Sequence, residues 1–154
     1  MSARARAEEE GDRPAAPPGL LGEPGLLGEL EHQGVPEFPA LTNDDAVDLG
    51  LAAVSLIRER DLNLAVDVVL HGDLVFRAKL KATGPENDAW LAGKAAVARR
   101  FEVPSLLVRL RHEAAGTPFE ARVDIDHDAF RAFGGAIPLR VAGVVVGTLT
   151  VSGE

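Results

Sequence analysis

Residues 64–80 read LAVDVVLHGDLVFRAKL, and this stretch decides the fold because it holds two strand-like segments joined by a short turn. The first seven residues are almost all apolar, which is typical of a strand that is buried on both faces. His71, Gly72 and Asp73 have turn-forming character. The second segment alternates apolar residues with Arg77 and Lys79, which we expect to face water. The sequence therefore predicts a β-hairpin with one buried and one half-exposed strand.

Helices are predicted on both sides of this hairpin along the chain. Thr42 can cap a helix that runs to about Arg60, and Asp45 at its third position suits the positive end of the helix dipole. Apolar residues then recur at helical spacing through this segment. Residues 87–101 form a second helical pattern, again with an apolar face.

The rest of the chain is predicted to be mainly strands. The expected elements are strands at residues 105–111, 119–125, 137–141 and 144–151, with a short helix at 126–133 that Gly134-Gly135 stops. The order is helix, hairpin, helix and antiparallel meander. Such an order predicts an α+β domain in which helices pack on an antiparallel sheet.

The first 35 residues differ from this domain in composition. They combine prolines, glycines and a charge run, and they contain a short Gly-Leu-Leu-Gly-Glu duplication at residues 19–23 and 25–29. We expect residues 1–35 to be a disordered tail that ends in a short helix near Leu27–His32. The folded domain is expected over residues 36–154.

Charge and composition exclude several classes of protein. A formal net charge of −8 argues against a nucleic-acid surface, which needs clustered lysine and arginine. The chain has no cysteine, so it forms no disulfide and offers no thiolate ligand or nucleophile. No apolar run approaches the ~18 residues of a membrane span, and no secretion signal is evident at the start. We expect a cytoplasmic protein that is not membrane-bound.

Patterns that would identify a metal site or a reaction are missing. The four histidines fall in the tail, in a turn or at the ends of elements, and no two have the i, i+4 spacing of a helical metal pair. Residues 124–128 resemble the start of a calcium loop, but Ala129 and Gly135 occupy the places that need glycine and glutamate. No phosphate-binding glycine loop or nucleophile elbow is present.

Asp67 and Lys94 are charged residues in apolar surroundings. Asp67 lies in a run of valines, and Lys94 shares a helical face with Trp90, the only tryptophan of the chain. A charge so placed must be paired, reach water, or face something outside the fold. Lys94 is the natural partner of Asp67, with Asp45 and Asp88 as other candidates. A structural ion pair is the preferred interpretation, and a functional site is the alternative.

Five segments in order resemble the haem-degrading-domain family, which includes HbpS-like and GlcG-like proteins. They are residues 38–46 with Leu49-Gly50, then Val66-Asp67-Val68, then Asn87-Asp88-x-Trp90-x-x-x-Lys94, then residues 134–139 and 147–153. The resemblance covers about Leu30 to Gly153. It implies a profilin-like α/β/α fold, assembly into a homo-oligomer, and haem or a related tetrapyrrole as the suggested ligand.

The chain departs from the family pattern in two ways. Relatives usually carry histidine before the paired glycines, where this chain has Phe133. Relatives also continue past Gly153 into a final helix, so we expect that helix to be missing here and part of the sheet to be uncovered. A truncated gene model would explain the same ending.

The resemblance and the residues together predict an oligomeric protein that binds a small planar or carboxylate ligand. The expected ligand-binding or structural polar cluster comprises Asn43, Asp45, Asp67, Asn87, Asp88, Trp90 and Lys94. Trp90 could stack on a planar ligand, and Lys94 could pair with a propionate or another carboxylate. The alternative is an assembly or adaptor protein without ligand chemistry. A hydrolase or isomerase that uses Lys94 and Asp67 is the third alternative, and no base or oxyanion donor set supports it.

Overall fold

The computed structural model describes residues 24–153, and the chain divides between Gln33 and Gly34 into two units. In the first unit α1 spans Pro24–Gln33, so the helix expected within the tail is present and begins earlier than predicted. The predicted disorder of the preceding residues lies outside the described part. Between residues 24 and 153 no helix is long and apolar enough to cross a membrane.

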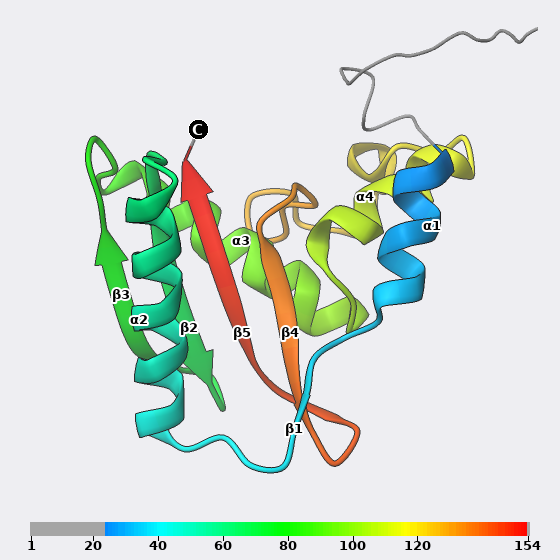
Figure 1. Cartoon of the computed structure of the whole chain (residues 1–154). Coiled ribbons are helices and arrows are strands. Elements are labelled where there is room, and N and C mark those ends of the chain that lie inside the picture. The colour runs from blue at the N-terminus through cyan, green and yellow to red at the C-terminus, as the bar shows by residue number, and fades with distance from the viewer. Residues whose placement is uncertain (1–23, 154) are drawn as a thin grey trace, which may run out of the picture. The chain divides into compact units, whose positions relative to one another are not determined.

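The second unit is a five-stranded sheet with helices on both faces. Its elements are β1 (Glu37–Phe38), α2 (Asn43–Glu59), β2 (Leu64–Leu70), β3 (Asp73–Lys79), α3 (Glu86–Phe101), α4 (Ser105–Ala114), the 3-10 turn η2 (Phe119–Ala121), β4 (Ala136–Val141) and β5 (Val144–Gly153). The strand order is β1-β4-β5-β2-β3. Helix α2 covers one face over β2 and β3, and α3 covers the other over β4 and β5 (Figure 1). The predicted α+β class and α/β/α layering are confirmed.

One detail of the predicted sheet is wrong, because the sheet is mixed and not wholly antiparallel. Strand β1 runs parallel to β4, whereas every other neighbouring pair is antiparallel. The central hairpin and the closing pair form as predicted. Strand β2 lies between β3 and β5, and all of its residues except Leu64 and Val69 are buried.

Helix α2 begins and packs as the sequence indicates. The Thr42 hydroxyl accepts from the Asp45 backbone N–H at 3.1 Å, and the Asp45 carboxylate accepts from the Thr42 N–H at 2.9 Å. This reciprocal capping box satisfies two free donors at the helix start. Gly50 then faces Phe76 of β3 so closely that a Cβ would lie 2.2 Å from its ring. The glycine therefore sets how near α2 lies to the sheet.

The strand predicted at residues 105–111 is wrong, because this segment is helix α4. Its buried residues include Leu107, Val108 and Leu110, which fall on one helical face. Val108 joins a core with Val97 of α3 and Phe119. The apolar pattern of residues 105–111 is so short that it fits both the two-residue period of a strand and the 3.6-residue period of a helix. Packing against α3 favours the helix.

Two further predictions between residues 119 and 133 are also wrong. The expected strand at 119–125 is a 3-10 turn followed by loop, because Phe119 and Ile125 both insert into the core beside α4. The expected helix at 126–133 is only a turn. The Arg131 backbone N–H donates to the carbonyl of Gly93 in α3, and this tertiary bond takes the donor that a helix would have used.

Candidate functional site

A cavity of about 500 Å³ lies where β5 ends, between the first half of α3 and the loop that follows β3. Five segments supply its walls, and the lining comprises Asn63, Ala82, Thr83, Glu86, Asn87, Trp90, Lys94, Phe133, Ser152 and Gly153. This volume falls in the range of small-molecule sites. We call it the Lys94 cavity.

Lys94 is the buried cation of this cavity. Its residue is 8 % exposed, and its ammonium donates a hydrogen bond to the Val151 carbonyl at 3.2 Å. Within residues 24–153 no carboxylate forms an ion pair with it. Burial lowers the pKa of the ammonium below its ordinary value, because water no longer solvates the charge.

Gly135 lets the chain pass close to Lys94. Its φ of +136° is unfavourable for residues with a side chain, and a Cβ there would lie 2.4 Å from the Val151 carbonyl oxygen. The same Cβ would lie 3.1 Å from the Lys94 ammonium nitrogen. The lysine position therefore depends on glycine at 135.

Aromatic residues form another part of the wall. The rings of Trp90 and Phe133 meet edge to face, with centroids 5.4 Å apart. The Arg131 guanidinium lies over the Trp90 ring at 4.5 Å. Trp90 remains 38 % exposed and Phe133 37 % exposed, so both rings keep free surface. Such surface can contact the flat face of a ligand.

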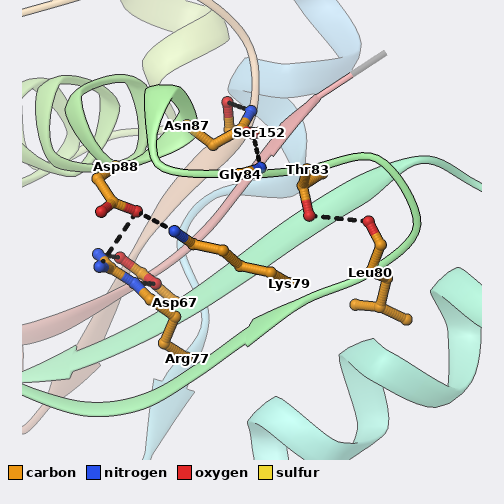
Figure 2. Close-up of polar contacts among 9 residues, drawn as sticks. All are labelled: Asp67, Arg77, Lys79, Leu80, Thr83, Gly84, Asn87, Asp88 and Ser152. Atoms are coloured by element: carbon orange, nitrogen blue, oxygen red, sulfur yellow. Dashed lines mark hydrogen bonds and ion pairs between the residues drawn. The ribbon is translucent and has the colours of Figure 1, made fainter.

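Asn87 ties the start of α3 to the end of β5. Its amide nitrogen donates to the Ser152 hydroxyl at 3.3 Å, and its carbonyl oxygen accepts from the Gly84 N–H at 2.9 Å (Figure 2). Both Asn87 and Ser152 are buried. They hold the cavity wall together and present polar atoms close to Lys94 in the same lining.

The predicted pairing of Lys94 with Asp67 is wrong, because Asp67 pairs with Arg77. The Arg77 guanidinium donates from two nitrogens to the two carboxylate oxygens of Asp67, at 2.6 and 2.7 Å (Figure 2). The two residues are direct cross-strand partners in the β2–β3 hairpin. A register irregularity between Val68 and Val69 places Arg77 opposite Asp67, whereas the two-residue turn alone would place Phe76 there.

Asp88 and Lys79 extend the Asp67–Arg77 pair into a group of four charged residues, which we call the ion-pair group. The Asp88 carboxylate lies 2.7 Å from the Lys79 ammonium and 3.3 Å from the Arg77 guanidinium (Figure 2). The hydrogen bond from Lys79 lowers the pKa of the Asp88 carboxyl. Asp88 is therefore engaged with β3, and it does not line the Lys94 cavity.

The predicted cluster thus divides into three places. Asn87, Trp90 and Lys94 line one cavity, Asp67 and Asp88 join the ion-pair group, and Asn43 and Asp45 stand at the start of α2. Sequence reasoning missed Phe133 and Ser152 as cavity residues. Among residues 24–153 no group of three or more histidine or acidic side chains is placed to hold a metal ion.

Comparison with known proteins identifies the family. Residues 41–154 match the family model described as haem degrading protein HbpS-like. The chain belongs to this family. A UPF0303 protein of Streptomyces coelicolor is 47 % identical over 117 residues, which cover 75 % of this chain and 74 % of the relative. The resemblance noted in the sequence is confirmed.

Solved structures in this HbpS-like fold superpose on the chain at lower identity. The crystal structure of the Ybr137w protein gives a TM-score of 0.77 at 24 % identity, covering 88 % of this chain and 82 % of that one. A crystal structure described as a PduOC:heme complex gives 0.58 at 23 % identity, covering 75 % and 83 %. At such identities the likeness establishes the fold alone.

Proposed function

We propose that the protein binds a small organic ligand through a carboxylate in the Lys94 cavity. The observation that carries this proposal is the Lys94 ammonium, which is buried, lines the cavity and has no ion-pair partner within residues 24–153. A buried cation without a counter-ion is costly, and an anionic ligand would supply one. Asn87 and Ser152 add hydrogen-bonding groups to the same lining.

Haem or a related tetrapyrrole is the ligand that family membership suggests. Its propionates suit Lys94, and its planar ring suits the aromatic surface of Trp90 and Phe133. The residues that usually bind haem iron are absent from the cavity lining, which contains no histidine, cysteine, methionine or tyrosine. We therefore propose binding through the ring and its carboxylates, without a role for iron.

Tryptophan fluorescence tests this proposal, because Trp90 is the only tryptophan and lies in the cavity wall. The purified protein is titrated with haem and with iron-free protoporphyrin. We expect saturable quenching by both, with Kd values within about threefold, because the shared ring and carboxylates make the contacts. Lys94→Met should weaken both by at least about tenfold, as expected for one charge-assisted contact.

Lys81→Met provides the matched control. Lys81 is an exposed lysine outside the cavity lining, and its partner is Asp61. We expect this variant to bind both porphyrins as the parent does. Absence of quenching at excess porphyrin, or an equal loss in both lysine variants, would contradict the ligand proposal.

Assembly is the second candidate function, and the exposed leucines of α2 favour it. Leu51 is 55 % exposed and Leu56 is 51 % exposed, although both lie on a helix that packs against the sheet. We propose that copies of the chain associate through this surface. Light scattering should then give a lower mass for the Leu51→Glu, Leu56→Glu double variant, and an unchanged oligomeric mass would rule this surface out.

A further inference from the structure

A second cavity, of about 390 Å³, lies at the other end of the sheet. It is lined by the turn that joins β2 to β3, by the start of β5 and by the last part of α3. The two cavities lie at opposite ends of the β2–β5 pair. Gly153, which pairs with Leu64, lines the Lys94 cavity, and Gly147, which pairs with Leu70, lines the second cavity. This second cavity shares no lining residue with the Lys94 cavity.

The ionisable side chains in the lining of the second cavity are basic. Arg99 and His71 belong to its lining, whereas no aspartate or glutamate does. Within residues 24–153 neither side chain forms an ion pair or a hydrogen bond. Arg99 and His71 therefore have no acidic neighbour within the lining of this cavity. They create a place where an anion is attracted.

A buried hydroxyl points to the same kind of ligand. Thr148 lines the cavity and is 1 % exposed, yet its Oγ1 has no hydrogen-bond partner among the described residues. A buried hydroxyl normally finds a partner, because leaving it unpaired costs free energy. Thr148 of β5 lies opposite Val69 of β2, and both residues line the cavity together with Arg99 of α3. An oxygen atom of a ligand in the cavity would satisfy it.

We propose that the second cavity binds a small organic oxyanion, either a phosphate or a carboxylate. Arg99 and His71 carry the donors that face the charge, and the Thr148 hydroxyl donates to one oxygen. The remaining side chains of the lining are valines, including Val69 and Val144, and they accommodate the apolar part of the ligand. The site is separate from the Lys94 cavity, so this proposal does not depend on the proposed function.

Titration followed by amide NMR tests the proposal with three probes: phenyl phosphate, benzoate and inorganic phosphate. Saturable shifts are expected at the amides of Gly72 and Gly147, which lie in the lining. Phenyl phosphate should bind at least threefold more tightly than inorganic phosphate, because only the ester has an apolar group for the valines. The ratio of phenyl phosphate to benzoate affinity then identifies the preferred oxyanion.

Three variants separate a built site from general attraction of anions. Arg99→Met should weaken phenyl phosphate at least tenfold, whereas Arg60→Met should leave its Kd unchanged because Arg60 is an exposed arginine outside the lining. Thr148→Val should weaken binding about threefold without lowering the Tm of the ligand-free protein, since its hydroxyl has no partner to lose. Absence of saturable shifts with every probe, equal effects of the two arginine variants, or a Thr148→Val variant that is less stable yet binds normally would each overturn the proposal.

Discussion

Asp67 on β2 and Arg77 on β3 face each other across the hairpin, and two hydrogen bonds of 2.6 and 2.7 Å join their side chains. This fork-to-fork geometry is the strongest arrangement for an arginine and a carboxylate. Because Arg77 occupies both oxygens of Asp67, the buried acid is neutralised without Lys94. The lysine is thus left as a cation on a cavity wall, and this separation of the two charges is what makes a ligand carboxylate its natural partner.

Lys94→Met should stabilise the ligand-free protein at neutral pH. Methionine fills a similar volume without placing a charge in the buried site, so we expect the Tm at pH 7 to rise by about 2–4 °C. Circular dichroism melting of the two proteins at matched pH measures this difference. A variant that melts well below the parent at pH 7 would mean that the hydrogen bond to Val151 outweighs the burial of the charge.

The same pair of proteins has a predictable pH dependence. Burial lowers the pKa of folded Lys94 below its ordinary value of 10.5, so between the two pKa values the unfolded chain binds a proton that the folded chain has released. The free energy of unfolding of the parent therefore rises with pH across this window. We expect the Tm advantage of Lys94→Met to shrink as the pH approaches 10.5, and a gap that is constant with pH would contradict this.

Asp67→Asn should lower the free energy of unfolding by about 2 kcal/mol, because it removes the buried carboxylate that accepts two hydrogen bonds from Arg77 and leaves the guanidinium with the more exposed Asp88 carboxylate at 3.3 Å. Urea unfolding followed by circular dichroism gives the value. Asp88→Asn is the control on the outer side of the same group, where the side chain is 45 % exposed, and its effect should be clearly smaller. Equal losses of unfolding free energy in both variants would show that the buried Asp67–Arg77 pair stabilises the fold no more than the exposed Asp88 carboxylate does.

Gly50→Ala should destabilise the domain by about 1–3 kcal/mol, because the added methyl group meets the Phe76 ring and forces α2 away from the sheet. Gly28→Ala makes the same change in α1, where no atom lies within 4 Å of the new Cβ. The control should leave stability unchanged or slightly raised, since alanine favours helix. Chemical unfolding of both variants tests the expected difference.

Gly135→Ala should reduce both stability and porphyrin binding. The alanine would adopt an unfavourable backbone conformation, and its methyl group would press on the Val151 carbonyl and on Lys94. We expect a loss of about 2 kcal/mol in the free energy of unfolding, with weaker quenching of Trp90 by protoporphyrin in the protein that remains folded. Unchanged quenching would show that the position of Lys94 does not depend on Gly135.

Much of the fold could be predicted because its decisive signals are local. Apolar runs, turn residues and the Thr42 cap determine the central hairpin and the helix before it, and the structure keeps all of these. The errors lie where tertiary contacts override local pattern. Val108 of α4 packs against Val97 of α3, and the Arg131 backbone N–H donates to the Gly93 carbonyl. The spacing of apolar residues in the sequence reveals neither contact.

The candidate site was predictable only in part for the same reason. Asn87, Trp90 and Lys94 follow one another on α3, so helical spacing alone brings them together. Phe133 and Ser152 join them through the path of the loop and the last strand, which sequence spacing does not give. The partner of Asp67 depends on the irregularity between Val68 and Val69, because a regular hairpin would pair Asp67 with Phe76 and not with Arg77.

The position of β3 at the border of the sheet has a consequence for solubility. Strand β3 is an edge strand of the sheet. The unpaired backbone N–H and C=O groups of an edge strand can pair with a strand from another molecule and start aggregation. Here Arg77 and Lys79 place charges on that strand, and their acidic partners hold them there. An incoming strand would have to accommodate these charges beside its own side chains. The ion-pair group thus protects the chain against β-aggregation, and neutralising Arg77 and Lys79 together would expose a continuous template for it.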